Sequence, residues 1–300
     1  MQTELLKSSS PRYIIISPAK DEERYVEHTL RSVTRQTVKP LLWIIVDDGS
    51  RDRTPELVDS YAHAYPFIRL LRHPRSGGRQ LSFGEVRAFN WGCDFIGPVD
   101  YDFIVKLDCD LSFDDDYFEQ VLERFQQDER LGIASGVYLE QSKADAWHEV
   151  VMPAYHAAGA SKIMRRACFE QIGGFVPAPG WDTVDEIKAM TRGWKTTHFR
   201  ELRMMHHKRE GSSIGSVNTG VMHGEAFYRT GGSKLFFALK ALHRIAVRPY
   251  LVNALGLIWG YLRAMVKRKQ LLVTEHEADF YKALLLGRLK SGAMCLLRKR

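Results

Sequence analysis

The sequence predicts an α/β fold in which a mainly parallel, doubly wound sheet is flanked by helices. Apolar runs of strand length alternate with segments of helical spacing along the first half of the chain. Acidic residues follow directly after several of these runs, at Asp47-Asp48 and at Asp108. The carboxyl ends of strands in an open α/β sheet are the places where ligands bind. The pattern therefore predicts both the fold and the edge that carries its site.

The expected elements follow one another as strand and helix. Runs rich in β-branched and aromatic residues predict strands over 13–16, 41–46, 67–71, 103–107 and 131–139, with an edge strand over 194–199. Helical spacing predicts helices over 21–35, from Pro55 onward, over 83–95, over 113–125 and from about 181 to 190. Right-handed crossovers would bring Ser17, Asp48 and Asp108 to one edge of the sheet.

Composition limits the class of protein. The 300 residues suffice for a large domain with an appendage, and the 45% hydrophobic and 26% charged residues exclude a disordered chain. The formal charge of +7 suits a phosphate-bearing substrate or an anionic membrane, and decides neither. No C-x-x-C pair occurs among Cys93, Cys109, Cys168 and Cys295, which argues against a zinc site or a disulfide framework and favours cytosolic thiols.

The expected division of the chain has three parts. Residues 1–11 contain an acidic residue and no long apolar core, so we expect a frayed lead-in and not a secretory signal. A catalytic domain is expected over 12–225, with a donor half over 12–112 and an acceptor half over 113–225. A helical C-terminal region is expected over 226–300.

Asp108 and Asp110 form a D-x-D pair directly after the strand that ends at Leu107. Hard cations such as Mg²⁺ and Mn²⁺ take oxygen ligands and are often held by one or two carboxylates, with substrate phosphate completing the shell. A D-x-D pair also occurs in ordinary solvated turns, so the rest of the chain must decide between the two readings.

A basic loop over 73–79 ends at Arg79, and the helix after it carries Arg87 and Asn90. Guanidinium groups bind phosphate oxygens in pairs, so this segment is a candidate for phosphate recognition. A merely solvated loop is the alternative.

Four motifs now occur in a fixed order: S-P-A-x-D-E-E at 17–23, V-D-D-G-S-x-D at 46–52, R-A-x-N-x-G at 87–92 and L-D-C-D at 107–110. Together they resemble the family 2 glycosyltransferases with the GT-A fold, which are inverting enzymes. The resemblance is specific to that superfamily and not to one sugar.

The resemblance implies a nucleotide-sugar site. Asp48, with Asp47 behind it, would accept a hydrogen bond from the ring N–H of the base, and Asp110, with Asp108 on the metal or the ribose, would hold Mn²⁺ or Mg²⁺. The remaining residues assigned to the donor are Ser17, Ala19, Asp21, Arg79, Arg87, Asn90 and Lys208.

The acceptor side would lie further along the chain. In the resembled family a loop like Gly173-Gly174-Phe175 lines it, although a structural helix stop is the alternative. Trp181 is a candidate for packing against a sugar face, or a core residue. The family places an acidic pair at the next helix start, and its aspartate is the catalytic base. Two residues are candidates for this base. The distance in sequence from Gly193 favours Asp182, whereas the presence of an adjacent acidic pair, Asp185-Glu186, favours Asp185, which we prefer.

His206 and His207 follow downstream, and a histidine at such a position completes the metal site in some GT-A enzymes. The alternative is that the cluster His206-His207-Lys208-Arg209 is a solvated basic face.

The C-terminal region contains a nearly uncharged stretch over 250–262 with basic residues on both sides. It is too short to span a bilayer. An interfacial segment on an anionic membrane, through residues 235–270, is one interpretation, and a buried helix is the other. The protein would then be cytoplasmic, with a peripheral position on the inner face of the cell membrane.

The function expected from the sequence is metal-assisted, inverting transfer of a sugar from a nucleotide-diphosphate sugar to a hydroxyl of a glycan, polysaccharide or lipid-linked acceptor. A catalytically inactive scaffold subunit is the alternative. A nucleotidyltransferase is disfavoured because no glycine-rich loop follows the first strand, and no motif for nucleic acid binding occurs.

Overall fold

The computed structural model describes residues 11–73, 83–141, 146–208, 215–245 and 251–297. The chain forms two compact units. The first, here the sheet unit, comprises Met1–Gly77, Arg87–Gly173 and Trp194–Lys208. The second, here the helical unit, comprises Gly78–Val86, Gly174–Gly193 and Arg209–Arg300.

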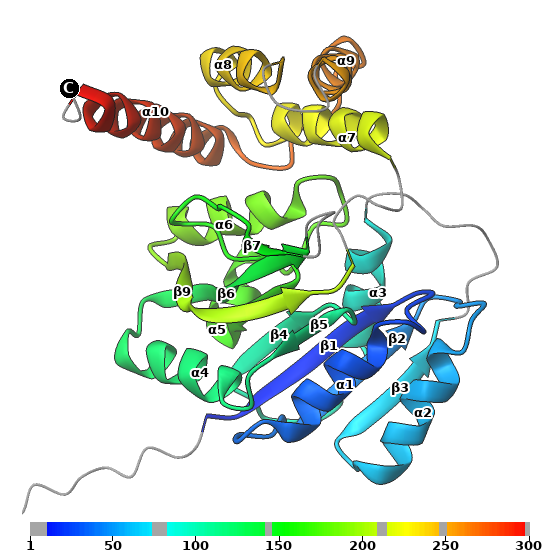
Figure 1. The fold of residues 1–300 in the computed structure, drawn as a ribbon. Coiled ribbons are helices and arrows are strands. Elements are labelled where there is room, and N and C mark those ends of the chain that lie inside the picture. Colours follow the sequence, from blue (N-terminus) through cyan, green and yellow to red (C-terminus); the bar gives the residue numbers. More distant parts are fainter. Residues whose placement is uncertain (1–10, 74–82, 142–145, 209–214, 246–250, 298–300) are drawn as a thin grey trace, which may run out of the picture. The chain divides into compact units, whose positions relative to one another are not determined.

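The sheet unit is built on one mixed sheet (Figure 1). Its strands within the described residues are β1 (Tyr13–Ala19), β2 (Leu42–Asp47), β3 (Ile68–Arg72), β4 (Phe103–Leu107), β5 (Leu111–Phe113), β6 (Leu131–Gln141), β7 (Trp147–Glu149), β8 (Ser161–Arg165) and β9 (Lys195–His206). They are ordered β3-β2-β1-β4-β8-β6-β9-β5, and β7 pairs with β6. The helices of this unit are α1 (Val26–Arg35), α2 (Thr54–Ala64), α4 (Tyr117–Gln127) and α5 (Arg166–Ile172), while α3 (Gly84–Cys93) has residues in both units.

The predicted parallel half of the sheet is confirmed. Strand β1 pairs in parallel with β2 and with β4, and β2 pairs in parallel with β3. All six residues of β2 are buried, as expected for a strand that is covered on both faces. The register sets Ala19 beside Asp47 and Ile16 beside Lys106, so β1, β2 and β4 end at the same edge.

Three details of the prediction were wrong. The helix expected over 113–125 begins at Tyr117, because Leu111–Phe113 form a short strand that pairs antiparallel with β9. Strand β9, expected as an edge strand over 194–199, continues to His206 and lies between β6 and β5. Strand β8, which lies antiparallel between β4 and β6, was not predicted, because Lys162 interrupts its apolar pattern although its side chain is fully buried in the fold.

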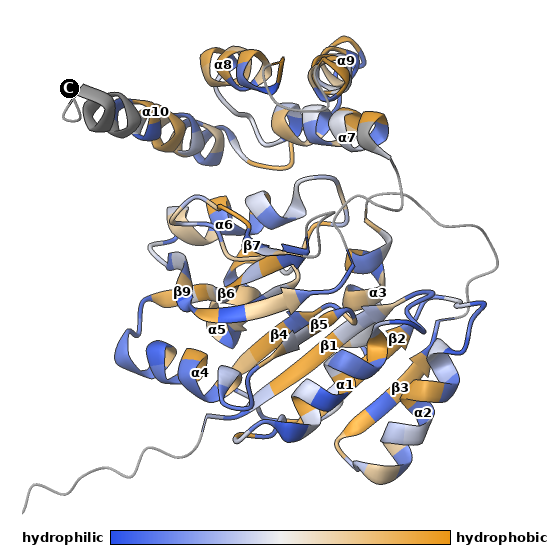
Figure 2. Cartoon of the chain, viewed as in Figure 1, coloured by the Kyte–Doolittle hydropathy of each residue, from blue (hydrophilic) through white to orange (hydrophobic). Residues whose placement is uncertain are grey.

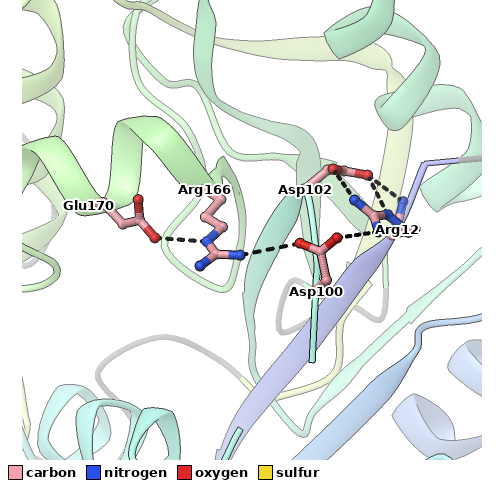
Figure 3. Close-up of polar contacts among 5 residues, drawn as sticks. All are labelled: Arg12, Asp100, Asp102, Arg166 and Glu170. Atoms are coloured by element: carbon pink, nitrogen blue, oxygen red, sulfur yellow. Dashed lines mark hydrogen bonds and ion pairs between the residues drawn. The ribbon is translucent and has the colours of Figure 1, made fainter. Parts of the chain in front are cut away.

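A network of ion pairs connects Arg12, which precedes β1, to later parts of the sheet unit (Figure 3). Arg12 donates to both carboxylate oxygens of Asp102, at 3.0 and 3.2 Å, and also to Asp100. Arg166 continues the chain, 3.6 Å from Asp100 and 2.7 Å from Glu170. The Arg12 hydrogen bonds lower the pKa of Asp102. These side chains are largely exposed, so the network orients chain segments more than it stabilises them.

The helical unit contains α6 (Trp181–Thr191), α7 (Ser216–Arg229), α8 (Lys234–Ile245), α9 (Val252–Val266) and α10 (Glu275–Leu297). Its core is apolar and aromatic. Phe237 stacks on Tyr261 with ring centroids 4.0 Å apart, and Phe227 packs against both rings. Val184 and Ile187 carry α6 into the same core.

Helices α7 and α9 meet along four glycines, Gly220 and Gly224 on α7 and Gly256 and Gly260 on α9, which we call the glycine seam. A Cβ atom at Gly224 would lie 2.0 Å from the Leu257 carbonyl oxygen, and one at Gly260 would lie 2.0 Å from that of Val221. No side chain fits at either position. Small residues four apart on both helices let the backbones approach this closely, an arrangement that is common in membrane helices.

Candidate functional site

Strand β2 ends in two buried carboxylates at the edge of the sheet unit. Asp47 and Asp48 are 5% and 6% exposed. The Asp47 Oδ1 atom accepts a hydrogen bond from the backbone N–H of Ser50 at 3.0 Å, across a turn in which Gly49 has a φ of +78°. The Asp48 Oδ1 atom lies 3.8 Å from Nδ1 of His73. The Asp47 side chain therefore holds the turn, and the Asp48 side chain is the one of the pair that faces the side chain of His73, a residue that follows β3.

The end of β1 supports this turn. Ser17 is fully buried and its hydroxyl accepts a hydrogen bond from Nε1 of Trp43 at 2.9 Å, and Ala19 is nearly buried. The backbone N–H of Asp48 donates to the Ala19 carbonyl at 2.9 Å. Asp21, with a φ of 53°, accepts from the backbone N–H of Arg51 at 2.9 Å. Of the predicted donor residues, Ala19 thus lies beside Asp47 and Asp48, Asp21 contacts the segment just after them, and Ser17 lies two residues earlier, beside Ile45.

Asp108 and Asp110, after β4, have different surroundings. The Asp108 Oδ1 atom is 2.6 Å from Nζ of Lys106, and 30% of its side chain is exposed. Asp110 is 7% exposed, and its Oδ2 atom lies 3.3 Å from Nε2 of His206. The Asp110 Oδ1 atom is buried and has no hydrogen-bond partner among the described residues. Asp110 therefore presents an unsatisfied oxygen in the interior of the site.

The antiparallel pairing of β5 with β9 explains why His206 is there. Leu111 is the register partner of His206, so Asp110 lies next to the histidine. The Nδ1 atom of His206 lies 3.5 Å from Glu140 Oε1. Burial alone would lower the pKa of His206, but hydrogen bonding to the two carboxylates outweighs it and raises the pKa to about 10. The imidazole is thus held between two acidic side chains.

His207 faces other groups. Its Nε2 atom lies 2.8 Å from the Ser112 hydroxyl, and its ring stacks on His28 with centroids 4.1 Å apart. Trp147 contacts the same ring edge-on. Of the two histidines that the sequence left open, His206 brings its imidazole to the Asp110 carboxylate, whereas His207 meets Asp110 through its backbone N–H, which donates to the Asp110 carbonyl at 2.9 Å.

Glu22 belongs to the same cluster, although the sequence analysis did not select it. It forms an ion pair with Lys208, and its Oε2 atom is buried without a hydrogen-bond partner among the described residues. Burial raises its pKa to about 7, and the negative charge of Asp110 adds to this shift. The signal in the sequence was the run Asp21-Glu22-Glu23 directly after β1. Lys106, a charged residue in an otherwise apolar strand, and Glu140 were also missed.

This cluster contains oxygen atoms of the kind that bind a hard divalent cation. Two buried carboxylate oxygens, on Asp110 and Glu22, lack hydrogen-bond partners within the described part of the chain, and leaving such atoms unsatisfied is costly. Carboxylate oxygens with one imidazole suit Mn²⁺ or Mg²⁺. Within the described residues, no group of three or more His, Cys, Asp or Glu side chains could hold a metal ion by itself, so other ligands would have to complete the shell.

The basic residues that the sequence assigned to the donor diphosphate lie on separate elements. Lys208 lies beside Glu22, as described, and Arg87 is exposed on α3 with Asn90 half-buried on the same helix. Gly92 explains how α3 approaches the sheet, since a Cβ atom there would lie 2.8 Å from Ile16 and 2.9 Å from Val46. Arg79 and Arg209 lie outside the described residues.

The predicted acceptor residues include a glycine pair and a tryptophan. Gly173, with a φ of 76°, ends α5 as a left-handed cap, and Gly174 has a φ of 70°. In the helical unit Trp181 is 6% exposed, packs against Phe175 with centroids 4.8 Å apart and donates to Glu85 at 3.1 Å. Gly173 therefore serves as a helix stop, and Trp181 is part of a core.

The acidic residues of α6 differ in exposure. Asp182 lies in the first turn and is half-buried, whereas Asp185 and Glu186 are 1% and 0% exposed. The Asp185 Oδ1 atom accepts a hydrogen bond from the backbone N–H of Glu186 at 2.7 Å. Gly180, which precedes the helix with a φ of 84°, packs against Ala226 of α7. Asp182 is thus the carboxylate of the three that keeps exposed surface.

Comparison with curated proteins gives partial matches. Poly-beta-1,6-N-acetyl-D-glucosamine synthase of Staphylococcus epidermidis is 29% identical over 118 residues, which cover 39% of this chain and 26% of the relative. The synthase of that name from Staphylococcus aureus strain COL is 30% identical over 116 residues, which also cover 39% of this chain and 26% of the relative. The match spans about a quarter of the length of these relatives.

Solved structures agree in fold. The mannosyltransferase PcManGT from Pyrobaculum calidifontis, in complex with GDP-Man and Mn²⁺, has a TM-score of 0.57 at 16% identity and covers 97% of this chain and 81% of its own. Staphylococcus aureus TarS 1–349, in complex with UDP-GlcNAc, has a TM-score of 0.55 at 16% identity, with shares of 90% and 78%. The fold is therefore of the GT-A type, as predicted.

The family model described as Glycosyl transferase family 2 matches residues 14–179, which is more than half of the 300 residues. This range begins in β1, runs through the D-x-D pair and ends shortly before α6. The chain belongs to glycosyl transferase family 2.

Proposed function

We propose that this protein is an inverting glycosyltransferase that moves a sugar from a nucleotide-diphosphate sugar to a hydroxyl group of a glycan, polysaccharide or lipid-linked acceptor. The observation that carries the proposal is the buried, unsatisfied carboxylate oxygen of Asp110 beside His206, at the sheet edge where β1, β2 and β4 end. Two structural neighbours were solved with nucleotide sugars, and the curated relatives are named for polysaccharide synthesis.

Asp110 and His206 would hold the divalent cation, with Asp108 on the cation or on the ribose. Such a cation supplies positive charge against the diphosphate that leaves the sugar. Lys208, whose ammonium is held by Glu22, would meet the same diphosphate through charge-assisted hydrogen bonds. Arg87 is exposed on α3 and is a second candidate to bind the diphosphate.

Asp48 would accept a hydrogen bond from the ring N–H of the base. Asp47 fixes the turn that positions it, through the hydrogen bond from Ser50. The buried residues Ser17 and Ala19 act by supporting this turn, since they have almost no exposed surface with which to contact a ligand.

We assign the catalytic base to Asp182. A general base must reach the proton that it abstracts. Asp182 keeps exposed surface in the first turn of α6, whereas Asp185 and Glu186 are buried and Asp185 is hydrogen-bonded within the helix. Asp182 would take the proton from the acceptor hydroxyl as that oxygen attacks the anomeric carbon opposite the leaving diphosphate, which inverts the configuration.

The direct test screens nucleotide sugars by thermal shift with and without Mn²⁺, and then measures release of the nucleoside diphosphate. Metal-dependent stabilisation by one donor, followed by its turnover, supports the proposal. Binding without any turnover would favour an inactive scaffold subunit. Release of pyrophosphate from a nucleoside triphosphate and a sugar phosphate would instead identify a nucleotidyltransferase.

We also propose that the protein works in the cytoplasm, with a peripheral position on the inner face of the cell membrane. Within the described part of the chain, Cys93, Cys109 and Cys168 form no disulfide bond, which suits a reducing compartment. Fractionation of cells without detergent, at low and at high salt, tests this location.

A further inference from the structure

Helices α8 and α9 expose apolar side chains along one stripe each. Leu235, Leu239 and Leu242 follow at helical spacing on α8 and are 59%, 42% and 62% exposed. Leu255, Trp259 and Val266 do the same on α9, at 64%, 62% and 77%. We call these six residues the docking face. Figure 2 shows that much of both helices is hydrophobic. Large exposed apolar side chains at helical spacing are typical of an interaction surface.

The exposure of this face is fixed by packing on the other side of the helices. On α9 the adjacent side, about 100° around the helix from the stripe, carries Gly256 and Gly260 of the glycine seam, which are in backbone contact with α7. On α8 the opposite side carries Phe237, which stacks on Tyr261 of α9. Rotating either helix to hide its stripe would break these contacts. The helical unit therefore holds the docking face outward.

The charges of the two helices are of one sign. Neither α8 nor α9 contains an Asp or a Glu. Lys234 lies at the start of α8, and Arg263, Lys267 and Arg268 lie at and just beyond the end of α9, all exposed. Apolar side chains bordered by cations match a surface of anionic headgroups over acyl chains. A second copy of the same face would present like charges, which disfavours self-association.

Among the described residues, no helix is both long and apolar enough to cross a membrane. We propose that the docking face binds an anionic membrane surface, with α8 and α9 lying in the interface and their apolar stripes entering the boundary between headgroups and acyl chains. The value of this membrane binding rests on the proposed function, because a glycosyltransferase held at the membrane surface would meet lipid-linked acceptors in the same plane.

The test is co-sedimentation of the full chain with vesicles of phosphatidylcholine alone and with vesicles that also contain phosphatidylglycerol. The wild type should bind the anionic vesicles, and high salt should weaken the binding. The double variant Leu255→Asp/Trp259→Asp should bind at least tenfold more weakly. The matched control Val151→Asp/Leu41→Asp, which changes two exposed apolar residues of the sheet unit, should bind as the wild type does.

Lys267→Glu/Arg268→Glu should remove the preference for anionic vesicles, and Trp259→Phe should remove part of the quenching of tryptophan fluorescence by brominated lipid. Equal binding to both vesicle types, or unchanged binding of the Leu255→Asp/Trp259→Asp variant, would overturn the proposal. So would a dimer that these changes dissociate without any lipid binding. Donor turnover without vesicles, together with thermal unfolding, checks each variant separately, so a failure of the proposed function is distinguishable from a failure of docking.

Discussion

The Oδ2 atom of Asp110 lies 3.3 Å from Nε2 of His206, although the two residues come from distant parts of the sequence. The contact depends on the short strand β5, whose antiparallel pairing with β9 sets Leu111 opposite His206. The second carboxylate oxygen of Asp110 is left buried without a hydrogen-bond partner among the described residues. We therefore expect changes at Asp110 and His206 to affect metal-dependent activity.

Asp110→Asn should lower the rate of nucleoside diphosphate release by about 100-fold or more, because it removes the negative charge that would hold the cation. His206→Ala should weaken activation by Mn²⁺, whereas the matched change His207→Ala should have a much smaller effect, since His207 faces Ser112 and His28. Titration of activity with Mn²⁺ after treatment with a chelator measures both. Equal Mn²⁺ affinities for the two histidine variants would contradict the assignment.

Asp182→Asn should reduce sugar transfer by about 10²- to 10⁴-fold while leaving donor binding unchanged, as expected for the loss of a general base. Asp185→Asn keeps an Oδ1 acceptor for the Glu186 N–H, but it replaces the second oxygen of a buried carboxylate with an NH2 donor, so we expect its main effect in the thermal unfolding temperature. Transfer assays and thermal unfolding on both variants separate the two roles. If Asp185→Asn were stable but inactive and Asp182→Asn active, the base would be Asp185.

Gly260→Ala should destabilise the helical unit by about 1–3 kcal/mol, because its new methyl group would collide with the Val221 carbonyl oxygen across the glycine seam. Gly287→Ala in α10 is the matched control. A Cβ atom there meets nothing within 4 Å, so the change should be neutral or stabilising by up to about 1 kcal/mol. Chemical denaturation followed by circular dichroism compares the two. Similar losses for both variants would show that the seam is not tightly packed.

Glu277→Gln should lower the free energy of unfolding by about 1 kcal/mol at neutral pH. Burial alone would raise the pKa of Glu277, but the backbone N–H of Thr274 and the Arg192 guanidinium lower it below its ordinary value of 4.5. A lowered folded-state pKa contributes stability above the unfolded pKa, and this is lost as the pH falls through the folded pKa.

The difference between wild type and Glu277→Gln should therefore shrink once the pH falls below about 4. Asp279→Asn, which removes a largely exposed carboxylate near the start of the same helix, serves as the control and should change stability little. Thermal unfolding at several pH values between 3 and 8 makes the comparison. A difference that stays constant over this range would refute the assigned role of the Glu277 charge.

Much of the sheet unit could be predicted from local pattern. The strands at 13–16 and 41–46 are continuous apolar runs, and the one at 103–107 is apolar except for Lys106. Strands β1, β2 and β4 contain all of these residues except Leu41. The polar ends of these strands then coincide because parallel strands end at one edge. Strand β8 was not predicted because the buried Lys162 interrupts its apolar pattern. Strand β5 was not predicted because its three residues are too few to form a recognisable pattern.

By itself, the sequence determined the parallel core of the fold and the residues that follow its strands, because burial on both faces of a sheet demands uninterrupted apolar runs. The motifs at 17–23, 46–52, 87–92 and 107–110 also pointed to the family. Only the tertiary structure decided that the imidazole of His206 and not that of His207 lies beside the Asp110 carboxylate, that Glu22 joins them, and that Asp185 and Glu186 are buried. These facts depend on strand register and helix rotation, which contacts between distant segments set.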